Sequence, residues 1–127
     1  MLSFLPQTST LDDALRAIRS RLASSLGHAT MLEIGPRYLH STGQLYKGGP
    51  DTGLFLLLTA EEPEDLPVPG EPFTFGILKR AQALGDFQAM QQKGRRILRV
   101  HLHGDPQASI RQLSSAIEEA AASLTRR

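Results

Sequence analysis

An apolar run near the middle of the chain, GLFLLLTA at residues 53–60, places the strongest constraint on the fold. A strand with one face in water alternates apolar and polar side chains, whereas this run is almost unbroken. Unbroken runs of this length are typical of strands that are covered on both faces. The run therefore predicts a central strand of a parallel sheet.

Strand and helix patterns alternate along the rest of the chain. Residues 2–6 (LSFLP) predict a short apolar strand that ends at proline, and residues 28–34 (HATMLEI) predict a weakly alternating strand. Residues 96–103 (RILRVHLH) alternate more clearly. The order is strand, helix, strand, short polar element, strand, helix, strand, helix. It predicts an α/β fold, a three-layer sandwich whose mainly parallel sheet is flanked by helices.

Three helices are expected, over residues 8–27, 74–94 and 105–124. Thr10, Thr74 and Asp105 are the expected N-caps, and Gly27 and Gly94 suit the ends of the first two. Apolar residues at helical spacing predict one buried stripe on each helix. The stripes are Leu11, Leu15, Ile18, Leu22 and Leu26 on the first helix, Ile77, Leu78, Ala81, Leu84, Phe87 and Met90 on the second, and Ile110, Leu113, Ile117 and Leu124 on the third.

The composition is that of one globular domain over residues 1–127, with 40% hydrophobic and 21% charged residues. The net charge is +1 without a long run of one sign, so neither a nucleic-acid partner nor a membrane is expected. Lys79-Arg80 and the basic residues at 93–96 are interpreted as a charged helix end and a strand entry. The sequence has no cysteine and opens without a basic leader, and we expect a cytoplasmic protein.

Generic catalytic and ligand motifs are missing from the sequence. It has no GxGxxG after a strand, no GxxxxGK[ST], no HExxH and no GxSxG. His101 and His103 lie two apart on an expected strand, so both point to one face and could form a metal pair. Two neutral imidazoles without an obvious carboxylate are a weak metal site, and a structural or surface role is expected. Neither a metal nor a cofactor is predicted.

The polar stretch GPRYLHSTGQLYKGG, at residues 35–49, is the most distinctive part of the sequence. Its HSTGQLYKGG portion resembles the histidine-bearing helix of glucose-6-phosphate isomerases. Farther along, PFTFGILKRAQAL at residues 72–84 resembles the helix start Pro-Phe-Thr-Leu-Gly-Ala-Leu of that family, in the same order. The stretch is even more similar to the segment GPRFLHSTGQLHKGGP in the isomerase part of bacterial transaldolase/glucose-6-phosphate isomerase fusions.

This resemblance implies a C-terminal sugar-isomerase (SIS) domain, a parallel sheet flanked by helices. The family converts an aldose phosphate to a ketose phosphate through a cis-enediol, and its histidine helps to open the sugar ring. That histidine aligns with His40, whose imidazole can exchange protons near neutral pH. In the family this histidine reaches a site formed largely by the neighbouring subunit, so the resemblance implies a homo-oligomer.

Departures from the family indicate that the chain alone lacks a complete site. The glutamate base and the Ser/Thr cluster that grips the phosphate belong to the other isomerase lobe, for which this chain is too short. A family lysine in the closing helix has no equivalent, and Arg111 is only a nearby positive charge; Tyr46 stands where the fusions have histidine. The expected partners are a sugar-phosphate substrate and the missing isomerase lobe, in the same or a partner chain.

Several neighbours of His40 are candidate substrate contacts. Gln44 lies one turn after His40, Lys47 could attract a phosphorylated sugar, and the planar fork of Arg37 suits oxyanions. Ser41 could instead cap the short helix, while Gly48 and Gly49 are expected in left-handed or turn geometry. The prediction is an aldose-ketose isomerase domain that interconverts glucose 6-phosphate and fructose 6-phosphate with His40 as its catalytic residue. The alternative is a non-catalytic sugar-phosphate-binding or dimerisation module.

Overall fold

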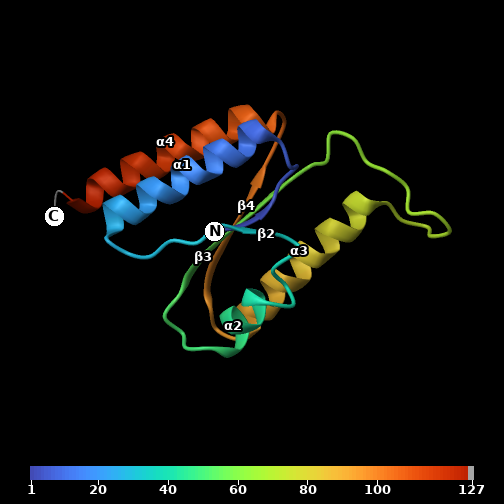
Figure 1. Ribbon diagram of the computed structural model, residues 1–127, viewed down its shortest axis with the longest axis horizontal. Helices are drawn as coiled ribbons and strands as arrows, with labels where there is room; N and C mark the ends of the chain where they lie inside the picture. Colours follow the sequence, from blue (N-terminus) through green and yellow to red (C-terminus); the bar gives the residue numbers. More distant parts are fainter. Residues whose placement is uncertain (126–127) are drawn as a thin grey trace.

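The computed structural model describes residues 1–125 and contains a four-stranded, all-parallel sheet with helices on both faces (Figure 1). This confirms the α/β fold class predicted from the sequence. The strand order is β2-β1-β3-β4. The elements are β1 (Leu2–Phe4), α1 (Ser9–Leu26), β2 (Glu33–Ile34), α2 (Thr42–Gly48), β3 (Leu54–Ala60), α3 (Phe75–Gln92), β4 (Arg96–Leu102) and α4 (Pro106–Thr125).

The apolar run forms β3, which pairs with β1 on one side and with β4 on the other. Its pairing with β4 covers seven residues, from Leu54 opposite Arg96 to Ala60 opposite Leu102. Leu57 and Leu58 have no exposed surface, although they point to opposite faces of the sheet. The prediction of a central parallel strand is therefore confirmed.

The strand expected over residues 28–34 is much shorter than predicted. Only Glu33 and Ile34 pair with β1, opposite Leu2 and Ser3. β1 is itself three residues long, so it offers little backbone for pairing. The sequence pattern was wrong for residues 28–32 because alternation alone does not show how far the neighbouring strand extends.

Two hydrophobic clusters fill the space on either side of the sheet. On one side α1 and α4 pack together over the cluster that includes Leu15, Ile18, Leu58 and Ile110. On the other side α3 and the polar stretch pack over the sheet around a cluster that includes Phe4, Leu57, Ala83 and Met90 (Figure 1).

Hydrogen bonds from side chains fix where the helices begin. Thr74 Oγ1 accepts from the amide of Ile77 at 3.2 Å, as expected for the N-cap of α3. Asp105 accepts from the first-turn amides of α4, which also matches the prediction. The prediction of Thr10 as the first N-cap is wrong. Thr8 takes that place because its hydroxyl accepts from the amide of Leu11 at 3.2 Å.

The buried face of α3 also differs from the prediction. Ile77, Leu78, Ala81 and Leu84 are exposed, whereas Met90 is buried and Phe87 partly buried as expected. Gly76, Ala83 and Asp86 are buried on the side that meets the sheet. Small side chains let α3 approach the sheet closely, and the larger apolar ones are left on the outer face.

The last turn of α4 carries another correction. Ile110 is buried and Leu113 and Ile117 are partly buried as predicted, but Leu124 is 59% exposed. Figure 1 shows α4 continuing past the end of α1, so the packing surface has ended before Leu124 is reached.

Candidate functional site

The polar stretch leaves the sheet at the end of β2 and crosses to α3. The amide of Gly35 donates to the Ser3 carbonyl at 2.8 Å, and its α-carbon lies so close to the Phe4 ring that a Cβ would overlap it. Residues 36–41 then form turns, and α2 follows. Glycine at position 35 thus lets the stretch start tight against the core.

His40 lies in the turns before α2, so the prediction that a helix carries it is wrong in detail. Ser41 is the N-cap residue, but its hydroxyl donates to the Tyr38 carbonyl at 3.2 Å and makes no capping bond. His40 is exposed, and its imidazole makes no hydrogen bond or ion pair within residues 1–125. An exposed imidazole without an internal partner is available to a substrate or to another lobe.

The three candidate substrate contacts have different environments. Gln44 is exposed, and its Nε2 donates to the Leu39 carbonyl at 3.2 Å. Arg37 is exposed and donates to Gln7 Oε1 at 2.9 Å, which links the stretch to the segment after β1. Lys47 points inward and pairs with a buried carboxylate. In the described part of the chain, no hydrogen bond or ion pair joins these three side chains to one another or to His40, and their substrate roles stay predictions.

A buried polar centre lies beneath the stretch and was not found from the sequence. Asp86, on the inner face of α3, is only 4% exposed. The Tyr38 hydroxyl donates to Asp86 Oδ2 at 2.6 Å, and Lys47 Nζ lies 2.5 Å from Asp86 Oδ1. Burial, the hydrogen bond to Asp86 and the negative charge of that carboxylate raise the pKa of Tyr38 well above its ordinary value. The sequence did carry a signal for this centre. Asp86 lies three residues before Ala89 and four before Met90, and this helical spacing places it on the side of α3 that faces the core.

Further contacts hold α2 at its carboxyl end. Arg95 donates to the carbonyls of Lys47 and Gly49 at 2.8 and 2.6 Å, where the last helical carbonyls need partners. Tyr46 donates to Glu33 at 2.7 Å; burial and this bond raise the pKa of Tyr46 to about 12. The stretch around His40 therefore rests on a network of buried and half-buried polar contacts.

Of the expected left-handed or turn geometry at Gly48 and Gly49, the left-handed alternative is wrong, since neither residue has a positive φ; Gly49 is the C-cap of α2 in extended geometry. Gly49 is required for another reason: a Cβ there would lie 2.6 Å from the Leu45 carbonyl oxygen. Gly48 has open space around it and lies within α2.

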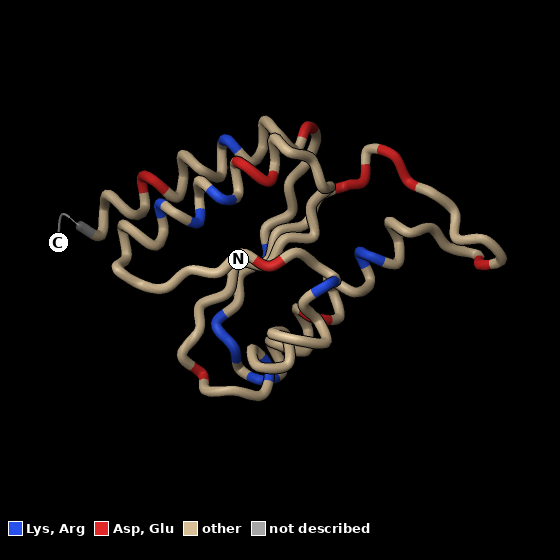
Figure 2. Tube along the Cα trace, viewed as in Figure 1, with Lys and Arg blue, Asp and Glu red and all other residues tan. Residues whose placement is uncertain are grey.

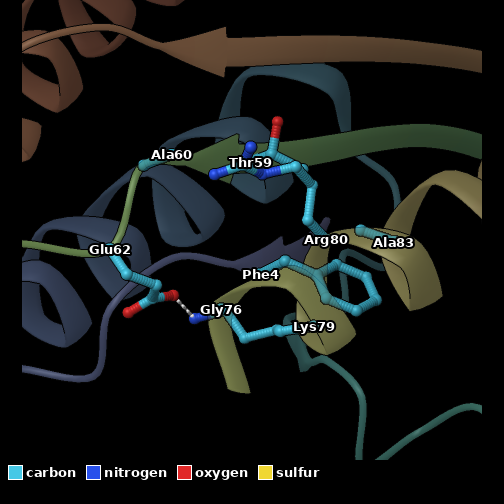
Figure 3. Close-up of a pocket in the computed structure, with 8 residues that line it drawn as sticks. All are labelled: Phe4, Thr59, Ala60, Glu62, Gly76, Lys79, Arg80 and Ala83. Atoms are coloured by element: carbon cyan, nitrogen blue, oxygen red, sulfur yellow. Dashed lines mark ion pairs between the residues drawn. The ribbon is translucent and has the colours of Figure 1, made fainter. Parts of the chain in front are cut away.

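A second polar region lies at the carboxyl ends of the strands, in a shallow crevice (Figure 3). Thr59 and Ala60 at the end of β3 and Lys79 and Arg80 of α3 contribute to its lining. His101 stands next to Thr59 on β4, and its ring lies 4.6 Å from that of His103. Within residues 1–125 no group of three or more potential metal ligands is found.

Figure 2 shows charges of both signs distributed over the chain, with acidic residues following β3. No helix among the described residues is both long enough and apolar enough to cross a membrane.

Comparison with known proteins supports the fold without naming a family. The chain defines a parallel α/β lobe and is similar to a solved structure, the hypothetical protein TT0462 from Thermus thermophilus, with a TM-score of 0.71. The identity is 20% and the match covers 91% of this chain but only 32% of that one. The chain thus spans about a third of the length of that protein. Neither the models of known protein families nor the curated proteins give a match.

Proposed function

We propose that this chain is one lobe of an aldose-ketose isomerase that interconverts glucose 6-phosphate and fructose 6-phosphate. The observation that carries the proposal is the stretch at residues 35–49, which resembles the histidine segment of glucose-6-phosphate isomerases and leaves His40 exposed. In this role His40 donates a proton to the ring oxygen and accepts one from the O1 hydroxyl as the ring opens. Because the imidazole has no internal partner in the described chain, both transfers are open to it.

The polar network beneath the stretch supports this role because it positions the backbone that carries His40. Tyr38 lies two residues before His40 and is anchored by Asp86. Lys47, at the far end of α2, is anchored by the same carboxylate. A proton-transfer group works best when the surrounding structure fixes its geometry. Lys47 is accordingly a positioning residue in this proposal, while Arg37 and Gln44 remain available to contact the sugar phosphate.

The second lobe is the proposed partner, in the same or another chain. The outer face of α3 carries three exposed large apolar residues, although its inner face also packs on the core. A helix with apolar residues on opposite sides is typical of a position buried on both sides. The similar solved protein is about three times as long as this chain, which leaves room for such a lobe. The exposed residues are Ile77, Leu78 and Leu84.

The test is an assay of fructose 6-phosphate isomerisation by the chain alone and after reconstitution with the adjoining isomerase lobe. The chain alone should show no turnover, because the glutamate base and the phosphate-binding cluster are expected in the other lobe. In the reconstituted enzyme, His40→Ala should lower kcat by about 10²–10⁴, the usual contribution of a general acid-base group.

His28→Ala is the matched control, since His28 is also exposed but lies in the segment before β2. It should leave the rate unchanged. Full activity in His40→Ala would remove the proposed catalytic role. If the assembled lobes bound fructose 6-phosphate without turning it over, the chain would instead be a non-catalytic binding module.

A further inference from the structure

The crevice at the carboxyl edge lies where neighbouring strands send the chain to opposite faces of the sheet. After β1 the chain enters α1 on one face, and after β3 it enters α3 on the other. Parallel α/β proteins bind ligands at such points, because the diverging loops leave a space outside the strand ends. Here the free volume is about 10 Å³, enough for one water-sized group. The crevice therefore suits one end of a ligand rather than a whole sugar ring.

A cross-strand pair presents a histidine beside this crevice. Thr59 and His101 face each other in the register of β3 and β4, and Thr59 Oγ1 lies 2.9 Å from His101 Nδ1. This bond fixes the imidazole plane and leaves Nε2 without a hydrogen-bond partner among residues 1–125. When Thr59 donates to Nδ1, the ring carries its proton on Nε2 and can donate it outward.

The two basic residues of α3 at the crevice differ in their partners. Lys79 forms an ion pair with Glu62 and donates to the Leu5 carbonyl at 3.3 Å, so its charge is already compensated. The neighbouring Arg80 is exposed and makes no hydrogen bond or ion pair within residues 1–125, although its charge acts on the carboxylate of Asp65. Figure 3 shows its side chain running from α3 toward the strand end that carries Thr59.

The groups around His101 disfavour its protonated form, although carboxylates at residues 61–65 also follow β3. Burial and the charges of His103, Arg99 and Arg80 lower the pKa of His101, while only Glu61 acts in the opposite direction. Arg99 lies on the same strand, with its guanidinium 5.7 Å from the centre of the Phe87 ring. A bound anion would relieve this repulsion and favour the protonated imidazole.

We propose that Arg80 and His101, with Thr59 positioning the imidazole, form a site for the phosphate group of a small phosphorylated molecule. The guanidinium of Arg80 offers a planar pair of donors at the crevice, and the imidazole Nε2 offers a third from beside Thr59, which also lines it. Three donors from different directions suit a tetrahedral oxyanion better than a planar carboxylate. The site shares no residue with the His40 stretch and does not rest on the proposed isomerase function.

The experiment titrates the chain with inorganic phosphate. NMR spectra monitor the signals of the carbon-bound ring protons of its four histidines. Sodium chloride at equal ionic strength is the reference, and His101→Gln assigns the signal. Phosphate should shift the His101 signal saturably and raise its pKa. Arg80→Gln should weaken binding about tenfold, as expected when a charge-assisted hydrogen bond is lost.

Arg16→Gln is the matched control, because Arg16 is exposed on α1 away from the crevice. This substitution should change the phosphate affinity by no more than about twofold, because a distant surface charge is largely screened by salt. His40→Ala should also leave it unchanged, which separates this site from the isomerase proposal. A His101 shift no larger than that in chloride would overturn the proposal, as would unaltered affinity in Arg80→Gln. Equal affinity for acetate would overturn the assignment to phosphate.

Discussion

Asp86 joins two segments that are far apart in the sequence, and it does so with a buried charge. The Tyr38 hydroxyl and the Lys47 ammonium approach its two carboxylate oxygens at 2.6 and 2.5 Å. Taking a carboxylate out of water is costly unless both oxygens have partners. The contact therefore specifies one arrangement of the polar stretch on α3, since any other would leave the charge uncompensated.

Asp86→Ala should lower the free energy of unfolding by about 3–5 kcal/mol, because it leaves the Lys47 ammonium without its buried partner. Tyr38→Phe should cost about 1.5–3 kcal/mol, the range for a hydrogen bond to a charged group. Urea unfolding measures both changes in the free energy of unfolding. The double variant should lose less stability than the sum of the two single losses. Glu119→Ala, on the exposed face of α4, should stay within about 0.5 kcal/mol of the parent. Strictly additive costs for the pair would contradict a shared network.

At the scale of elements, α2 is held by close backbone contacts. A Cβ on Gly43 would lie 2.8 Å from the Tyr38 carbonyl oxygen, which already accepts the Gly43 amide at 2.8 Å. The Tyr38 carbonyl belongs to the turn that presents His40, and the Gly43 amide belongs to α2. A side chain at this position would force the turn and the helix apart.

Gly43→Ala should therefore destabilise the chain by about 1–3 kcal/mol, as overpacking against an immobile backbone does. Gly48→Ala is the matched control in the same helix, where a Cβ has open space and φ is not positive. It should be neutral or stabilise by up to about 1 kcal/mol, because alanine favours the helix. Thermal unfolding followed by circular dichroism compares the two. If both substitutions had the same effect, the close contact with the Tyr38 carbonyl would have no energetic importance.

The strands were predicted more reliably than the orientation of the helices. The apolar run of β3 was sufficient to predict a buried central strand, because few other structures bury consecutive residues on opposite faces. For α3 the same reasoning selected Ile77 and Leu84 as core residues, although they are 51% and 42% exposed. Helical spacing identifies the apolar sides of a helix but not which of them meets the sheet, and α3 has two apolar sides. Asp86 was missed for a related reason, since its partners come from a distant segment.

The candidate site was predicted only in part. The exposure of His40 agrees with a substrate-facing residue, but nothing in the local pattern showed that Lys47 would turn toward α3. That orientation depends on Asp86, which lies 39 positions farther along the chain. The pairing of His101 with Thr59 was equally hidden, because it follows from the register between β3 and β4. Long-range pairing of this kind is set by the assembled sheet.

At the scale of the whole molecule, the outer face of α3 exposes several large apolar side chains to water. Ile77 and Leu84 are two helical turns apart on that face, and Leu78 adds to it near the start of α3. Clusters of large apolar side chains on a surface are typical of contact with another protein. Without the proposed second lobe, this face should associate with another copy of the chain.

The combined substitution Ile77→Lys and Leu84→Lys should abolish that association while leaving the fold intact, because both side chains are largely in solvent. Sedimentation velocity over a range of concentrations should give the parent a mass that rises with concentration, and the variant the monomer mass of 13.9 kDa. Ala120→Lys, on an exposed position of α4, should behave like the parent. The same double variant should fail to restore isomerase activity with the second lobe, since one face serves both contacts. Activity equal to the parent's would mean that the second lobe docks elsewhere, and association equal to the parent's would exclude α3 as the self-association surface.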